Sequence, residues 1–103
     1  MALRRRIDLQ AVLENVLGSD HVYFQPPETV KMKYPCIVYS RSDSAINHAD
    51  NQKYMKYKRY SVTVIDYDPD SAIPDRVEDL PFCSFGRFYT KDNLNHWSFE
   101  LYY

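Results

Sequence analysis

The stretch KRYSVTVID, residues 58–66, decides the fold. Apolar and polar residues alternate along it, as they do in a strand with one buried and one wetter face. The apolar face carries Tyr60, Val62 and Val64, and the opposite face carries Arg59, Ser61 and Thr63. This alternation, which begins near Tyr54, predicts the central β-strand of the protein.

Helical spacing is clearest over residues 5–18. Apolar residues recur there at i, i+3, i+4, i+7 and i+8, which are Leu9, Val12, Leu13, Val16 and Leu17. Gly18 is a suitable helix stop, and Asp8 lies near the positive end of the helix dipole. The apolar stripe needs a surface to cover, and a sheet provides that surface most economically.

The remaining elements are shorter. The sequence predicts strands at 22–24, 36–39, 83–90 and 96–103, and a short helix in which Ile73, Val77 and Leu80 recur at i, i+4 and i+7. The polar residues 41–53 predict a long loop or the tip of an extended hairpin. We therefore expect an α+β sandwich, in which a small, mostly antiparallel sheet packs against one main N-terminal helix and a short second helix.

Length and composition fit a single domain over residues 1–103. Of these residues, 45% are apolar and 16% aromatic, including ten Tyr, which suffices for one core. Two Cys do not make a disulfide scaffold. The chain has no apolar stretch of about 18 residues, and Arg4–Arg6 is not followed by a signal-peptide core. We expect a cytosolic chain with reduced thiols and no membrane partner.

Charge is unevenly distributed. Residues 1–60 carry ten Lys or Arg against six acids, whereas residues 61–103 carry three against eight. Opposite poles of this kind can attract a second copy head to side, or two different partners.

No catalytic or metal-binding arrangement is predicted. Asp66, Asp68 and Asp70 mimic the first ligands of a calcium loop, but Ser71 stands where the loop needs Gly. We interpret the segment as a strand end and an Asx turn. The three His lie in separate segments, and Cys36 and Cys83 are flanked by apolar residues, which favours inert buried thiols. We expect no enzymatic activity, no metal and no cofactor.

The stretch KYMKYKRY, residues 53–60, leaves two interpretations open. Basic and aromatic residues interleave in it, as in modules that bind single-stranded nucleic acid. In a strand, Tyr54, Lys56, Lys58 and Tyr60 would share one face and could form a stacking platform. A charged strand or hairpin that reaches a neighbouring subunit fits the same residues.

Several phrases of the sequence resemble a known family. They are YFQPPE at 23–28, MKYPCIVY at 32–39, KRYSVTVID at 58–66, DPDS at 68–71, Ile73-Pro74, Leu80-Pro81, CSF at 83–85 and DNLNH at 92–96. Together they resemble the tail-terminator or tail-completion proteins of long-tailed, siphovirus-type bacteriophages. The resemblance runs from about residue 7 to residue 103 and rests on phrases of sequence rather than on a catalytic signature.

The resemblance implies a small α/β module, with a sheet flanked by helices, that assembles into a hexameric ring. Such rings cap the tail tube, end its polymerisation and join the tail to the neck of the filled head. They need no cofactor. The partners implied are further copies, the major tail tube protein and a neck or stopper protein, and the place implied is the tail–neck junction of a virion assembled in the host cytoplasm. Stoppers and head–tail adaptors share size and position with terminators, so these roles stay open.

Two sets of residues follow as candidate sites. For contact with the tube or a neighbouring copy we nominate Ile46, His48, Tyr54, Met55 and Tyr57, together with Arg41 and Arg59, which could pair with Asp66, Asp68 or Asp75 of an adjacent copy. For the lining of the lumen, through which DNA slides without specific binding, we nominate Asp68, Asp70 and Asp79, because carboxylates repel phosphate.

Overall fold

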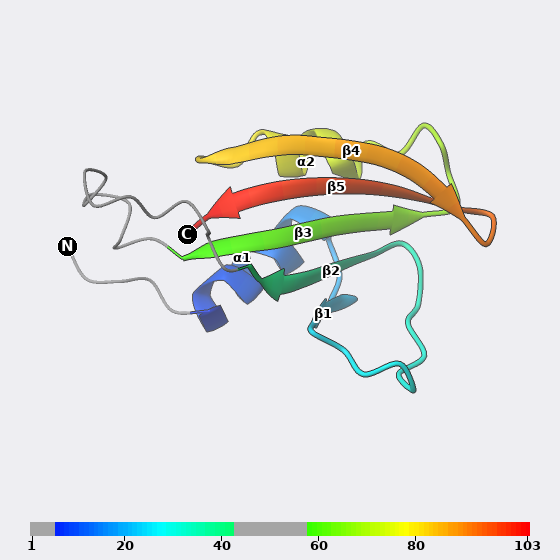
Figure 1. Ribbon diagram of the computed structural model, residues 1–103, viewed down its shortest axis with the longest axis horizontal. Helices are drawn as coiled ribbons and strands as arrows, with labels where there is room; N and C mark the ends of the chain where they lie inside the picture. Colours follow the sequence, from blue (N-terminus) through cyan, green and yellow to red (C-terminus); the bar gives the residue numbers. More distant parts are fainter. Residues whose placement is uncertain (1–5, 43–57) are drawn as a thin grey trace.

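The computed structural model describes residues 6–42 and 58–103. Along the chain the elements are α1 (Arg6–Leu17), β1 (Val22–Phe24), β2 (Cys36–Arg41), β3 (Arg59–Asp66), α2 (Ile73–Glu78), β4 (Cys83–Lys91) and β5 (Leu94–Tyr102) (Figure 1). The strands form one five-stranded sheet in the order β1-β2-β3-β5-β4. Only β1 and β2 run parallel, and the other neighbours are antiparallel. The α+β prediction is confirmed, with β3 in the centre of the sheet.

Both helices cover the same face of the sheet. The core under them joins Leu9, Leu13 and Leu17 of α1 with Ile73 and Val77 of α2. The strands contribute the side chains that share this face, among them Ile37, Tyr39, Tyr60, Val62, Val64, Phe99 and Leu101. The alternation predicted for residues 58–66 is therefore the alternation between this core and the other face.

The helix ends follow from local chemistry. Gly18, with a φ of +86°, ends α1, and its N–H donates to the Glu14 carbonyl at 2.8 Å. The second helix ends at Glu78, two residues before Leu80, because the Leu80 N–H turns back to the Val77 carbonyl at 3.0 Å. An Arg76 Nη1 bond to the Val16 carbonyl, at 3.2 Å, ties the two helices together.

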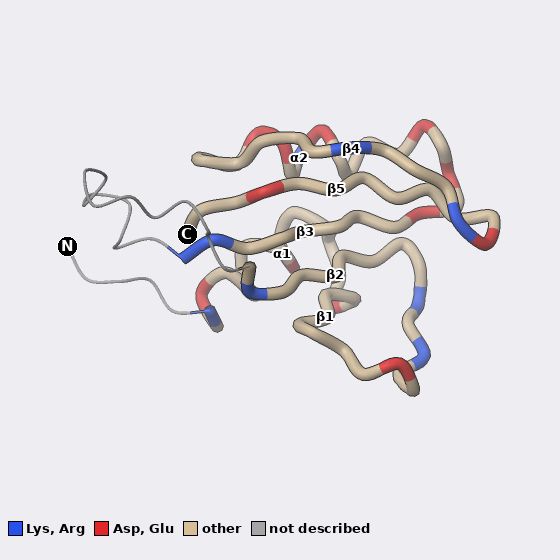
Figure 2. The backbone as a smooth tube through the Cα atoms, viewed as in Figure 1, with Lys and Arg blue, Asp and Glu red and all other residues tan. Residues whose placement is uncertain are grey.

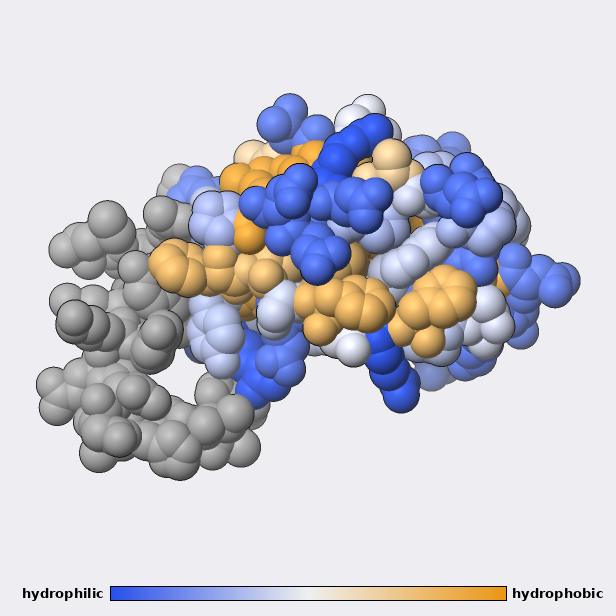
Figure 3. All heavy atoms as spheres, turned by 90° about the horizontal axis from the view of Figure 1, so that it is seen from above, coloured by the Kyte–Doolittle hydropathy of each residue, from blue (hydrophilic) through white to orange (hydrophobic). Residues whose placement is uncertain are grey.

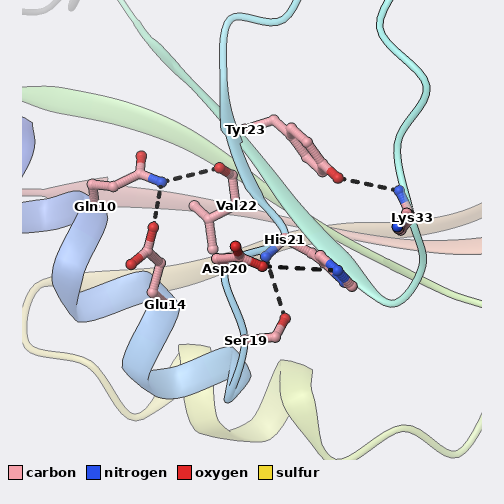
Figure 4. A network of polar contacts seen from close by, with 8 residues as sticks. All are labelled: Gln10, Glu14, Ser19, Asp20, His21, Val22, Tyr23 and Lys33. Atoms are coloured by element: carbon pink, nitrogen blue, oxygen red, sulfur yellow. Dashed lines mark hydrogen bonds and ion pairs between the residues drawn. The ribbon is translucent and has the colours of Figure 1, made fainter.

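A polar network fixes α1 against the sheet (Figure 4). Gln10 Nε2 donates to the Val22 carbonyl of β1 and to Glu14 Oε2, both at 3.0 Å. The Gln10 side-chain oxygen accepts a bond from the Tyr39 hydroxyl, which itself accepts one from Arg6 Nη1 at 3.1 Å. Because Tyr39 is almost fully buried, these bonds remove the cost of burying its hydroxyl.

A second, smaller core lies on the face opposite the helices. Its buried members are Cys36, Ile65 and Leu94. Residues packed against them include Met32 and Tyr34 of the β1–β2 connection, which returns over this end of the sheet. The alternation of β3 did not predict the burial of Ile65, because this cover comes from a loop without periodicity.

Burial in this cluster raises the pKa of the Cys36 thiol to about 12, and the nearby Asp66 adds to the effect. The unfolded chain releases this proton near pH 9, whereas the folded state keeps it. The stability tied to the thiol is therefore fully present below pH 9 and is lost as the pH rises toward 12.

We expect the free energy of unfolding to fall by about 1 kcal/mol per pH unit in this window. Urea unfolding of the parent and of Cys36→Ala, measured at several pH values between 9 and 12, tests this. The free energy of unfolding should fall less steeply with pH in the variant. An equally steep fall in both proteins would contradict the assignment to Cys36.

Candidate functional site

Strand β4 forms one edge of the sheet (Figure 1). Among the described residues it pairs with β5 on one side. Along its nine residues only Cys83 and Tyr89 are half-buried, and the others are exposed. An edge strand with exposed side chains is a surface that another molecule can reach.

A bulge at Gly86 brings two phenylalanines of β4 to the same face. Phe85 lies opposite Phe99 and Phe88 lies opposite Trp97, so three positions on β4 match two on β5. Without the extra residue, Phe85 and Phe88 would point to opposite faces. Gly86 suits the bulge because a Cβ there would lie 3.0 Å from the Ser98 carbonyl oxygen.

The result is an exposed apolar stripe, which we call the aromatic edge: Phe82, Phe85 and Phe88. Their exposed fractions are 59%, 45% and 49%. Figure 3 looks onto this edge and shows apolar side chains gathered along it. Three half-exposed phenyl rings present roughly 300 Å² of apolar surface, a size typical of functional patches on small proteins.

The rings of the aromatic edge are held in place from below. The Phe85 ring meets the buried Phe99 ring edge-on, with centroids 5.5 Å apart. The Phe88 ring lies 5.3 Å from that of Trp97. Because the Phe85 and Phe88 rings rest on rings of β5, these two members of the stripe are preorganised, which lowers the entropic cost of binding another surface.

Acidic residues border this edge (Figure 2). The segment between β3 and β4 runs along the same side of the molecule, and its helix α2 contacts β4. Its exposed acids are Asp68, Asp70, Asp75, Glu78 and Asp79. Burial raises the pKa of the Cys83 thiol to about 11, and the charge of Glu78 adds to it, which places that carboxylate close to the start of β4. The apolar stripe thus has a negative border.

The turn after β3 is built as the sequence predicted. Asp66 Oδ1 accepts a bond from the Asp68 N–H at 3.1 Å, and Asp68 Oδ1 accepts one from the Asp70 N–H at 2.9 Å. These are consecutive Asx turns. Across residues 6–42 and 58–103, no group of three or more His, Cys, Asp or Glu is placed to hold a metal ion.

Basic residues gather at another end of the sheet, where β2 ends and β3 begins (Figure 2). We call this set the basic end: Arg6, Arg41, Lys58 and Arg59. Arg41 is exposed. Arg59 forms an ion pair with Glu100 of its own chain, Nη2 to Oε1 at 2.6 Å. Its pairing with an acid of an adjacent copy stays a prediction. The pair with Glu100 already occupies one edge of the guanidinium.

The face opposite the helices carries a stack of three side chains. Tyr89 and His96 lie with centroids 4.7 Å apart and planes 13° apart, and the Arg87 guanidinium lies 4.8 Å above the Tyr89 ring. The Tyr89 ring is therefore in contact with side chains of its own chain. Tyr60 is 2% exposed and packs in the core, so it offers no surface for stacking a base.

The described residues include only some of those nominated from the sequence. Ile46, His48, Tyr54, Met55 and Tyr57 lie outside the described residues. Arg41 and Arg59 lie at the same end of the sheet but on opposite faces, because Arg41 is paired with Tyr60, the residue next to Arg59. The three proposed lumen acids are exposed and do not form one cluster along the chain: Asp68 and Asp70 lie in the turn after β3, and Asp79 caps the end of α2.

The aromatic edge escaped the sequence analysis. Phe85 and Phe88 are spaced by three inside the strand predicted at 83–90, and Phe82 lies three residues before Phe85, which conflicts with a strand period of two. That conflict, next to a glycine in a strand, is the signal of a bulge that could have exposed the patch.

No family model matches the chain, and comparisons with curated proteins and with solved structures give no significant match. Among the described residues, no helix has the length and apolar character to cross a membrane.

Proposed function

We propose that this protein is a virion structural protein, the tail terminator of a long-tailed bacteriophage. Its copies form a ring, which the resemblance implies to be a hexamer. The ring caps the tail tube, ends its polymerisation and joins the tail to the neck. The observation that carries the proposal is the aromatic edge, together with the sequence phrases at 23–39 and 58–74. A subunit with a complete core that still presents a preorganised apolar stripe is built to be covered by another subunit.

Ring closure demands two different patches on each copy, which meet when one copy is rotated onto the next. The acid-bordered aromatic edge and the basic end support this proposal, because they are two surfaces of different character on one copy. The proposed role needs neither catalysis nor a cofactor. Its partners would be further copies, the tube protein and a neck protein.

Tails assembled from a phage genome that lacks the gene test this proposal. Tubes of uncontrolled length, seen by electron microscopy, would support termination. Tubes of normal length that fail to join heads would instead assign the chain to the stopper or adaptor role. Normal tails on complete particles would overturn both, and expression of the protein from a plasmid should restore the normal phenotype.

The acids nominated for the lumen give a separate prediction. Replacing Asp68, Asp70 and Asp79 together with Lys should lower infectivity by about tenfold or more, because a positive lining holds the phosphates of passing DNA. All three side chains are exposed, so the variant should still fold, and electron microscopy of its tails separates a loss of assembly from a loss of DNA passage. The control reverses two acids, Asp20 and Glu28, which are exposed on the β1 side. Full infectivity of the triple variant would remove these residues from the lumen.

A further inference from the structure

One copy of the chain presents two surfaces of complementary character. The aromatic edge is apolar and carries Asp75 and Glu78 on the neighbouring helix. The basic end carries cations beside half-buried tyrosines. There Arg59 lies opposite Tyr102 in the β3–β5 register, and the Tyr103 N–H donates to the Lys58 carbonyl at 2.8 Å. Apolar and aromatic surface with opposite charges at its border is what two sides of one interface require.

Self-contact of two aromatic edges is disfavoured. A two-fold contact would place the acids of one α2 against those of the other, and like charges facing each other in an interface oppose association. The basic end of a second copy replaces that repulsion with attraction. Charge therefore selects a head-to-side contact over an edge-to-edge dimer.

The bulge decides the kind of contact. A β-bulge on an edge strand interrupts regular backbone pairing with an added strand. Arg87 follows the bulge directly, so a charged side chain also stands in the middle of the edge. The edge is therefore suited to side-chain packing against a second copy rather than to extension of the sheet.

We propose that the aromatic edge of one copy is covered by the basic end of a second copy of this chain. Phe85 and Phe88 form the apolar centre of the contact, and Asp75 and Glu78 pair with Arg41 and Lys58. The inference rests on the proposed function in one respect: the ring requires that the same contact repeats around an axis. Roughly 300 Å² of apolar surface is less than the ~800 Å² per partner of a standard interface, so the charged border supplies the rest of the contact.

Two charge reversals test the pairing. The first variant, Asp75→Lys with Glu78→Lys, replaces the two acids of the proposed pairs with cations. The second, Arg41→Glu with Lys58→Glu, replaces the two cations of these pairs with acids. We expect each variant alone to self-associate at least tenfold more weakly than the parent in sedimentation. An equimolar mixture should recover association to within about threefold of the parent, because each surface then finds an opposite one on the other variant.

The fold should tolerate these changes. All four positions lie at the surface, exposed or half-buried. In α2 the new lysine in the first turn opposes the helix dipole and the one in the last turn favours it, so the two effects offset. Thermal unfolding of each variant checks that it is folded. If the reversal of Asp75 and Glu78 does not fold, the neutral variant Asp75→Asn with Glu78→Gln replaces it. This variant should reduce the salt dependence of association.

The control is the reversal of Asp20 and Glu28 on the β1 side, which changes net charge equally. We expect it to leave association unchanged. An equal loss in the control, association of either variant at the strength of the parent, or a mixture of folded variants without recovery would each overturn the proposal. So would a parent that stays monomeric at about 1 mM, where even a contact of ~4 kcal/mol is half-formed. Tail length in the gene deletion reports on the proposed function separately, because the mixture experiment needs no tails.

Discussion

Replacing Phe85 and Phe88 together with Ser should weaken self-association by about a hundredfold or more. Each phenyl ring exposes about half of its surface, roughly 100 Å², and covering that area contributes about 2.5 kcal/mol before the costs of ordering. Two rings at the centre of a contact therefore account for about 3 kcal/mol after the costs of ordering, and a hundredfold change corresponds to about 2.7 kcal/mol. Sedimentation across a range of concentrations measures the change.

The monomer should stay folded in this double variant. The two rings are half-exposed, and the ring contacts that the variant loses are those with Phe99 and Trp97. The matched control is Tyr67→Ser, since Tyr67 is 64% exposed and its ring meets Tyr34 of the second core rather than the aromatic edge. Unchanged association in the double variant, or an equal loss in the control, would show that the aromatic edge is not the contact.

The second large effect concerns Phe99, the ring on which the aromatic edge rests. Phe99 is 1% exposed and lies between Val62 of β3 and Phe85 of β4 in the sheet register. Phe99→Ala should lower the free energy of unfolding by about 3–5 kcal/mol, because it removes buried apolar area and leaves a cavity in a close-packed core. That is a large share of the ~5–15 kcal/mol that stabilises a typical domain.

Urea unfolding measures this loss. Phe85→Ala is the control, because its ring is half-exposed and should cost about 1 kcal/mol. A loss below about 1.5 kcal/mol for Phe99→Ala would mean that the core collapses around the missing ring. At low urea, where the variant is still folded, its self-association should also fall, since Phe85 has lost the surface that orients it.

Much of the secondary structure follows from the sequence alone. The stripe of α1 and the alternation of β3 repeat over enough residues to be recognised without any tertiary contact. The N–H of Gly18 and the Asx turns at Asp66 and Asp68 use bonds within four residues, so their chemistry is written in the local sequence. The hairpin turn of Asp92 and Asn93, both at positive φ, is local in the same way.

The candidate site was harder to predict from the sequence. The uneven charge of the two halves predicted oppositely charged surfaces, and the basic end and the acidic border lie within those halves. Which acids flank β4 depends on where α2 packs. The choice of Glu100 as the partner of Arg59 depends on β5 lying beside β3, over a separation of 41 residues.

The sequence by itself determined the elements, the buried faces of α1 and β3, and the turns, because each depends on periodicity or on bonds between near neighbours. Only the tertiary structure decided the strand order, the loop that buries Ile65, and the bulge that turns Phe85 and Phe88 to one side. These features arise when strands distant in sequence compete for the same neighbours. A single extra residue in that pairing reverses the face of every side chain that follows, and the local pattern indicates it only through a glycine between side chains spaced by three.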